Sequence, residues 1–130
     1  MIRIALIGLI AIGFAGSPVS AQGAGDAAKG KTIFQQQCGI CHQVGPNAHN
    51  TIGPVLNGVY DAKPAAVPGF NFSPAMKEAA KKGIVWNDAN LNKFLENPQG
   101  FIPGTTMPYA GLPNATERAD VIAYLKTLKS

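Results

Sequence analysis

The sequence predicts an all-α fold in which about four helices and long loops form a single small domain. Three observations lead to this prediction. Apolar residues recur at helical spacing in four segments. No two strand-like segments are joined by a tight turn. No internal repeat, low-complexity tract or linker divides residues 22–130, which are few enough to share one hydrophobic core.

The first helix is predicted to run from a cap at Asp26 to about Cys38. Ala27, Gly30 and Phe34 follow helical spacing within it. Glycine lowers helix stability, so Gly30 either marks the close approach of another element or is simply tolerated.

The second helix is expected to open at Ser73, as cap, with Pro74 in its first turn. It should end at Lys81, Lys82 and Gly83, where cations face the negative end of the helix dipole and glycine stops the helix.

The third helix should open at Asn87 or Asp88 and close before Pro98, because proline breaks a helix. The last should run from about Thr116 to Leu128. The apolar stripes of these two helices comprise Leu91, Phe94, Leu95, Val121, Ile122, Tyr124, Leu125 and Leu128.

Two further segments bear on these predictions. Asn114 and Glu117 resemble a capping box at the start of the last helix, with Asn in place of the usual Ser or Thr. Residues 43–72 carry many prolines and glycines with little periodicity. A loop of this length is unusual in a small domain and becomes reasonable if it wraps a cofactor.

The chain has two cysteines, and both lie in the pentad Cys38-Gly39-Ile40-Cys41-His42. This C-x-x-C-H spacing is typical of a c-type haem attachment site. Each thiol can add to a vinyl group of the porphyrin, and the histidine then lies under the iron as an axial ligand. The pentad therefore predicts one covalently attached haem c per chain.

Other interpretations of the pentad are weaker. A thioredoxin-type redox pair needs a surrounding βαβ pattern, which the sequence lacks. A zinc site would have to combine Cys38, Cys41 and His42 with the distant His49 in a crowded set. A plain disulfide between the cysteines remains possible in an oxidising compartment.

The N-terminus predicts export. Arg3 precedes an uncharged apolar run over residues 4–14, and the small residues 19–21 follow Ser17 and Pro18. This pattern is typical of a secretory signal peptide, residues 1–21, cut after Ala21. An uncleaved anchor is the alternative, although the run is shorter than the roughly 20 residues of a bilayer span. Export predicts a periplasmic protein with no stable membrane insertion after cleavage.

A second iron ligand is expected from the loop around Met107. Pro103, Gly104 and Pro108 keep this methionine out of a helix, whereas Met76 lies in a predicted helix as a core methionine would. A thioether favours reduced iron, and His/Met ligation raises the potential. We therefore predict His42 and Met107 as the two ligands, with His49 solvated.

The charge balance does not indicate nucleic-acid binding. Eleven Lys and Arg residues stand against seven Asp and Glu, for a formal net charge of +4. Propionates of a bound haem would offset part of this charge, and no dense basic stripe with interleaved aromatic residues is present.

The chain resembles the class I cytochromes c, in particular the cytochrome c2 and mitochondrial-like branch. The resemblance rests on the pentad together with segments 53–54, 68–70, 83–86, 95–98, 102–107 and 122–125. It spans Gly30 to Leu128 and implies the class I cytochrome c fold around one haem.

The resemblance also implies roles for individual residues. The carbonyl of Pro54 would accept a hydrogen bond from the ring of His42, which fixes its tautomer. Trp86 would direct its indole N–H at a propionate or, alternatively, only pack in the core. Thr105 would support the same edge of the haem, and Tyr109 would pack near the exposed rim.

The same resemblance implies that Gly30 and Phe34 lie where the first helix crosses the last, opposite Tyr124. Departures from the family pattern occur around the haem, where Ala62, Phe72 and Phe94 replace polar residues. They also occur at three places where the family often has lysines, namely Gln37, Gln99 and Thr106. We therefore expect weak charge steering and a largely apolar contact with partners.

The resemblance implies a soluble, monomeric periplasmic one-electron carrier and not an enzyme. Its donor would be a bc1 complex or a periplasmic dehydrogenase, and its acceptor a terminal oxidase or a photosynthetic reaction centre. No nucleic acid is expected to bind. The alternative functions are a haem c enzyme, or a gas-binding sensor, with a labile sixth ligand.

Overall fold

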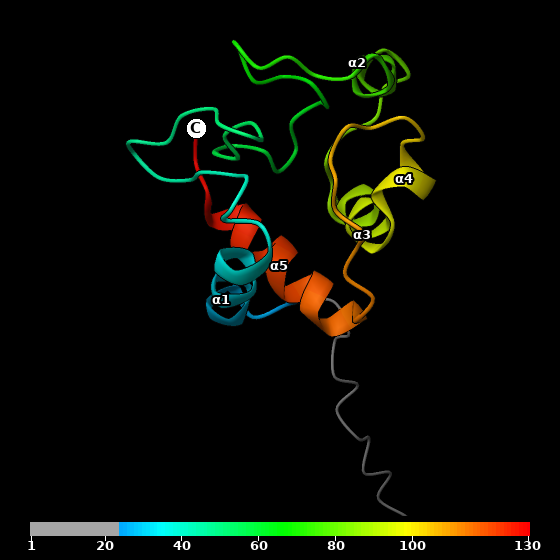
Figure 1. The fold of residues 1–130 in the computed structure, drawn as a ribbon. Coiled ribbons are helices and arrows are strands. Elements are labelled where there is room, and N and C mark those ends of the chain that lie inside the picture. The colour runs from blue at the N-terminus through cyan, green and yellow to red at the C-terminus, as the bar shows by residue number, and fades with distance from the viewer. Residues whose placement is uncertain (1–23) are drawn as a thin grey trace, which may run out of the picture.

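The computed structural model describes residues 24–130, and the signal peptide predicted for residues 1–21 lies outside them. Within this range the fold is all-α and contains no strand, as predicted (Figure 1). Its helices are α1 (Ala27–Gln37), α2 (Pro74–Lys81), α3 (Asp88–Glu96), α4 (Pro98–Phe101) and α5 (Ala115–Thr127). None of the helices in residues 24–130 is both long enough and apolar enough to span a membrane.

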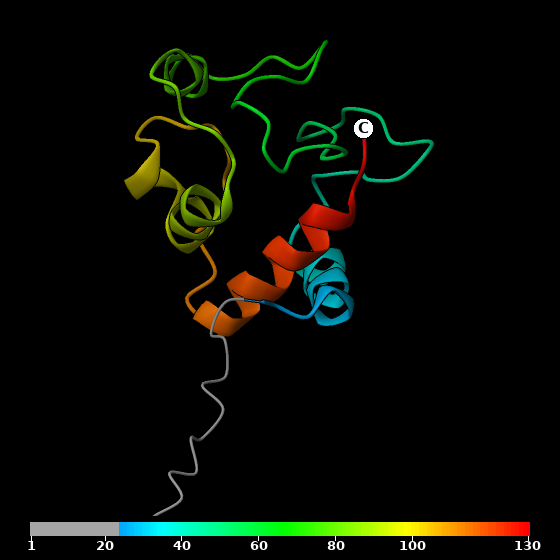
Figure 2. The ribbon, with the colours of Figure 1, turned by 180° about the vertical axis from the view of Figure 1, so that it is seen from behind.

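The first and last helices cross and pack against each other (Figures 1 and 2). The crossing point is Gly30, where a Cβ atom would collide with the carbonyl of Asp120. The rings of Phe34 and Tyr124 meet edge to face beside it, with centroids 5.4 Å apart. This confirms the expected crossing and shows that Gly30 is required for close approach.

A buried carboxylate reinforces the crossing. Asp120 is 6% exposed, and its Oδ1 accepts a 2.7 Å hydrogen bond from the backbone N–H of Asp26. The side chain of Asp26 in turn caps α1 by accepting from the N–H groups of Ala28 and Lys29. The first turn of α1 is thereby fixed to the middle of α5.

Gly30→Ala is expected to lower the free energy of unfolding by about 2–3 kcal/mol, because the new methyl group overpacks the α1–α5 crossing. In an isolated helix the same change would stabilise by up to about 1 kcal/mol, so the sign separates packing from propensity. Thermal or urea unfolding measures the effect. Lys31→Ala, at an exposed position in the same helix, is the control and should change stability little. A stabilised Gly30→Ala would contradict the close crossing.

The caps of the remaining helices follow the predicted chemistry. The Ser73 hydroxyl accepts from the N–H of Met76 at the start of α2, and the Asn87 side chain accepts from Asn90 at the start of α3. Asn114 caps α5 by accepting from the N–H groups of residues 116 and 117. Only this half of the expected capping box forms in the structure.

Helix α4 was not predicted. Pro98 lacks the N–H needed to continue α3, so the sequence indicates a helix end there. The same residue has a backbone suited to the first turn of a new helix. Asn97 closes α3 and caps α4, because its Oδ1 accepts from the N–H of Gly100 at 3.0 Å.

The long segment between α1 and α2 is held by asparagine side chains instead of regular structure. Asn57 accepts from the N–H of Gly45 and donates to its carbonyl, at 2.9 and 2.8 Å. Asn50 accepts from Val55 and donates to Pro68, at 2.9 and 3.0 Å. These contacts give the segment a fixed path without helices or strands.

The hydrophobic core lies between α1, α3 and α5 and includes Trp86. Half-buried apolar side chains from the 38–72 segment and from the loop after α4 also pack against this core. They include Cys38, Val44, Leu56, Val59, Tyr60, Met107 and Tyr109. In Figures 1 and 2 the 38–72 segment and the α3–α4 unit form two sides of the molecule, joined by the α1–α5 pair.

Candidate functional site

The cysteine pentad forms tight turns directly after α1. The N–H of Cys38 donates to the carbonyl of Phe34 at 2.8 Å, and the N–H of His42 donates to that of Cys38 at 2.9 Å. Both cysteines are half-buried free thiols in the structure. Burial, with a smaller contribution from Cys41, raises the pKa of Cys38 to about 11. The Cys38 thiol is therefore neutral and faces an apolar environment.

The imidazole of His42 has one nitrogen engaged. Its Nδ1 donates to the carbonyl oxygen of Pro54 at 2.8 Å, which is the contact that the resemblance implies. Burial lowers the pKa of His42, an effect that this hydrogen bond opposes. A carbonyl only accepts, so the proton of the neutral ring lies on Nδ1 and Nε2 keeps its lone pair. This is the form in which histidine binds a metal.

Gly53 provides the space in which this ring lies. A Cβ atom there would come within 2.6 Å of Cε1 and 2.8 Å of Nδ1 of His42. Its N–H donates to the carbonyl of Cys41 at 2.8 Å, and the Thr51 hydroxyl donates to the same oxygen at 3.0 Å. The turn that carries Pro54 is thus bound to the pentad itself. In the sequence, Gly53 is only one residue of the segments that carry the resemblance, and no local pattern indicates this role.

The Met107 loop is anchored by Thr105. Thr105 is 5% exposed, its Oγ1 accepts a 3.4 Å hydrogen bond from the N–H of Met107, and its carbonyl accepts from the Gln99 side chain at 2.7 Å. Met107 lies outside any helix and is half-buried against the core. Met76 is also half-buried against the core, but within α2.

Trp86 is buried, and its ring lies 4.9 Å from that of Phe94, centroid to centroid. Its backbone pairs with the long loop, accepting from Asp61 at 3.1 Å and donating to Ala62 at 2.8 Å. Residues 24–130 contain no buried side-chain polar atom that lacks a partner. No described residue accepts a hydrogen bond from the Trp86 indole N–H. That nitrogen is therefore not fully enclosed and can donate to a bound group.

Tyr109 joins the two halves of the site. Its hydroxyl donates to the Gln37 side chain at 2.9 Å, across 72 positions of sequence. Burial, together with the nearby Cys38, raises the pKa of Tyr109, so the hydroxyl stays protonated and able to donate. The Met107 loop is therefore attached to the end of α1, next to the first cysteine.

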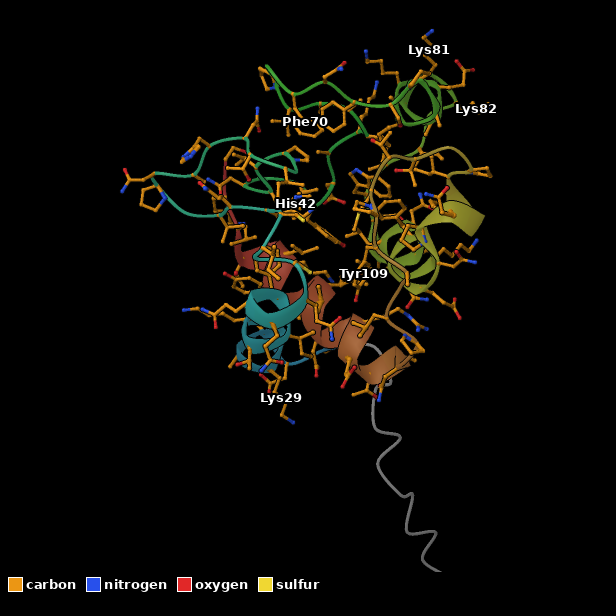
Figure 3. The ribbon with its side chains drawn as sticks, viewed as in Figure 1. Lys29, His42, Phe70, Lys81, Lys82 and Tyr109 are labelled. Atoms are coloured by element: carbon orange, nitrogen blue, oxygen red, sulfur yellow. The ribbon has the colours of Figure 1, made fainter. Side chains whose placement is uncertain are left out.

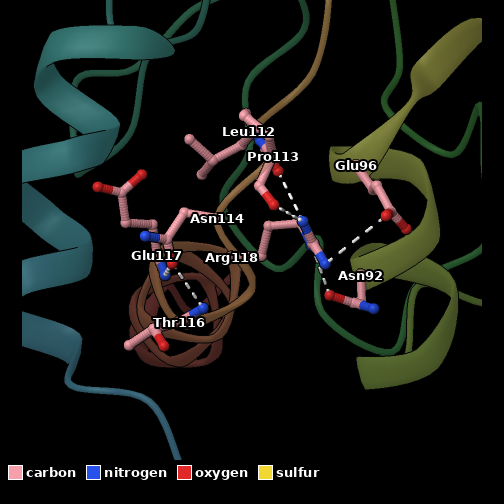
Figure 4. Close-up of polar contacts among 8 residues, drawn as sticks. All are labelled: Asn92, Glu96, Leu112, Pro113, Asn114, Thr116, Glu117 and Arg118. Carbon is pink, nitrogen blue, oxygen red and sulfur yellow. Dashed lines mark hydrogen bonds and ion pairs between the residues drawn. The ribbon is translucent and has the colours of Figure 1, made fainter.

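Sequence reasoning missed Arg118, which is 5% exposed. Its Nη1 donates to the carbonyls of Leu112 and Pro113 at 2.8 and 2.9 Å, and its Nε donates to Asn92 Oδ1 at 2.8 Å (Figure 4). Glu96 lies 4.0 Å from Nη2. Arg118 thus connects α5 to α3 and to residues 112 and 113, which follow the Met107 loop. A signal was present, because position 118 continues the apolar stripe of α5.

The alternatives for the pentad receive no support. Within residues 24–130 no three His, Cys, Asp or Glu side chains come close enough to hold a metal ion, as a zinc site would require. His49 is exposed, and its N–H donates to Gln43. The cysteines are not paired in a disulfide.

The residues present fit a covalently held porphyrin. Two free thiols and an imidazole with an available Nε2 lie within five positions of one another. Around them, apolar side chains from two segments are only half-buried against the core, as expected where a flat apolar group completes the packing. The indole N–H of Trp86 would be able to donate to an anionic edge of that group.

Comparison with known proteins gives consistent results. The family model for cytochrome c matches residues 27–129. Cytochrome c2 of Rhodomicrobium vannielii is 48% identical over 126 residues, covering 97% of this chain and 94% of that protein. Cytochrome c of Euglena viridis is 49% identical and covers 81% of this chain and 99% of its own length. The structure of cytochrome c2 from Rhodospirillum centenum is similar, with a TM-score of 0.76, 37% identity, and coverage of 82% of this chain and 100% of that one.

Proposed function

The chain belongs to the cytochrome c family, and on this basis we propose that it carries single electrons with His42 and Met107 as the two axial ligands of its haem. Like its cytochrome c and c2 relatives, it is an electron carrier that holds haem c covalently, and it is not an enzyme. Its haem iron supplies the chemistry by gaining and losing one electron.

The hydrogen bond from His42 Nδ1 to Pro54 is the single observation that carries the ligand proposal. It leaves Nε2 as the metal-binding nitrogen, and the turn containing Gly53 fixes the ring against rotation. Cys38 and Cys41 would hold the porphyrin through two thioether bonds. Met107, in the loop that Thr105 anchors, would supply the second ligand and keep other ligands from the iron.

Trp86 and the apolar residues around it have a supporting role. The indole N–H is available to donate to a propionate, and the half-buried side chains exclude water from the metal. Because hydrogen bonds hold the turns that carry both proposed ligands, little would have to reorganise when the electron enters or leaves.

Absorption spectroscopy of the purified protein tests the ligand set. The oxidised protein is expected to show the weak red-region band of sulfur-ligated ferric haem, and the reduced protein is expected to resist carbon monoxide at neutral pH. Rapid carbon monoxide binding would instead indicate an open iron position, as in a haem enzyme or a gas sensor.

We also propose export to the periplasm with cleavage after Ala21, on the pattern of residues 1–21. The mass of the protein from a host competent in cytochrome maturation should equal residues 22–130 plus one haem. A mass that retains residues 1–21 would indicate an uncleaved anchor.

The proposed donors are a bc1 complex or a periplasmic dehydrogenase, and the proposed acceptors are a terminal oxidase or a photosynthetic reaction centre. The protein would meet them as a monomer. Mixing the reduced or oxidised protein with each purified complex, and following the haem absorbance, identifies which of them exchange electrons with it.

A further inference from the structure

Two long segments of this chain carry no Asp, Glu, Lys or Arg: residues 32–60 and residues 97–116. The first contains the haem-attachment pentad, and the second contains Met107. Every Asp, Glu, Lys and Arg of the described chain lies outside these two segments. The two segments that contain the proposed iron ligands are therefore formally uncharged, apart from the two histidines of the first segment.

The two uncharged segments meet in the structure. The Tyr109 hydroxyl of one donates to the Gln37 side chain of the other at 2.9 Å. Within the first segment, the turn 51–53 is bound to the carbonyl of Cys41 through Thr51 and Gly53, at 3.0 and 2.8 Å. Ile52 at the tip of that turn is consequently held next to the pentad that contains Ile40.

Ile40 and Ile52 are the large hydrophobic residues that the described chain leaves exposed, at 78% and 66%. The remaining large apolar side chains of residues 24–130 are buried or half-buried. One exposed isoleucine lies in the pentad and the other in a turn that is hydrogen-bonded to it, within a segment that carries no acidic or basic residue. We call these two residues the isoleucine face, an apolar patch beside the cysteines.

Three of the lysines lie at the ends of the molecule. Lys29 is at one end of the molecule and Lys81 and Lys82 at the other, with His42 and Tyr109 between them (Figure 3). An electron-transfer partner that used these lysines would have to contact the ends of the molecule and not the attachment site.

We propose that the isoleucine face is the docking surface for redox partners, and that it takes a partner whose own docking face is uncharged and apolar. This inference rests on the function proposed above and specifies its partner. A carboxylate-rich partner face would lose water at this surface and gain no opposite charge in return, which disfavours it. A neutral partner face would bury the two isoleucines and leave no charged group without a partner.

Electrodes of defined surface chemistry test this proposal on the haem-loaded protein. Gold coated with a methyl-terminated alkanethiol imitates an apolar partner, and a carboxylate-terminated monolayer of equal length imitates an acidic one. The electron-transfer rate constant is expected to be several-fold higher on the methyl surface. It should also change less than about twofold between low and high salt, because an uncharged contact is not screened.

Variants at the isoleucine face sharpen the test. Ile40→Ser with Ile52→Ser is expected to lower the rate on the methyl surface several-fold, whereas Ile40→Val with Ile52→Val should retain it. Ile40→Lys should shift the preference towards the carboxylate surface and introduce salt dependence. Ala89→Lys adds the same charge at an exposed position of α3, outside both uncharged segments, and serves as its control.

Three results would overturn the proposal. One is a faster, salt-sensitive reaction of the unaltered protein on the carboxylate surface. Another is a double serine variant that reacts as fast as the original on the methyl surface. The third is a dimer in sedimentation that the serine changes dissociate, which would assign the face to a second copy of this chain. The red absorption band, measured in each variant, shows separately whether the proposed ligand set is intact.

Discussion

Replacement of Met107 by alanine is expected to abolish the weak red band of the oxidised protein, to admit carbon monoxide to the reduced iron, and to lower the reduction potential. The thioether is a neutral, polarisable ligand that favours the reduced metal. Axial ligands set haem potentials over a range of about 0.8 V, and we expect Met107→Ala to lower the reduction potential by more than about 0.1 V. Spectroscopy and potentiometric titration measure both effects.

Met76→Ala is the matched control, since Met76 is also half-buried against the core but lies in α2. It should keep the red band and the potential while losing some stability through a cavity. If Met107→Ala kept the band and Met76→Ala lost it, the ligand assignment would pass to Met76.

Arg118→Met is expected to lower the free energy of unfolding by about 3 kcal/mol or more, because several acceptors lose the donor that they share. The variant keeps a similar apolar stem but leaves the carbonyls of Leu112 and Pro113 and the amide of Asn92 without their donor. Each buried polar group without a partner costs about 1–3 kcal/mol. The exposed Glu96 at 4.0 Å contributes little, because surface ion pairs are weak.

The destabilisation in Arg118→Met should be concentrated in the Met107 loop. Amide exchange of residues 103–113 is expected to quicken in Arg118→Met, since the end of the Met107 loop loses its attachment to α5. Urea unfolding measures the global effect. Lys126→Met removes an exposed cation 2.8 Å from Asp88 and is the control, expected to change stability by less than about 1 kcal/mol. Equal stability of Arg118→Met and the unaltered protein would contradict this role.

Local signals were sufficient for most of the secondary structure. The caps at Asp26, Ser73 and Asn87 act on backbone groups two or three positions away, so their effect is visible in the sequence. Helix α4 was missed because the signal at Pro98 is ambiguous. The same residue ends one helix and opens another, and its burial against the core stabilises the second.

The candidate site also contains residues that the sequence identifies and contacts that only the structure shows. The pentad is contiguous, and its spacing alone indicates haem attachment, so Cys38, Cys41 and His42 could be identified without a structure. The contacts of Arg118 with Asn92 and of Tyr109 with Gln37 join residues 26 and 72 positions apart. No local pattern specifies such pairs.

The sequence by itself determined the all-α class, the attachment chemistry and the limits of four helices, because these depend on neighbours within about one helical turn. Only the tertiary structure decided that Gly30 is a crossing point, that Gly53 makes room for the His42 ring, and that Ile40 and Ile52 remain in contact with solvent. The physical reason is that close approach and burial are properties of two surfaces together. The second surface comes from a distant part of the chain.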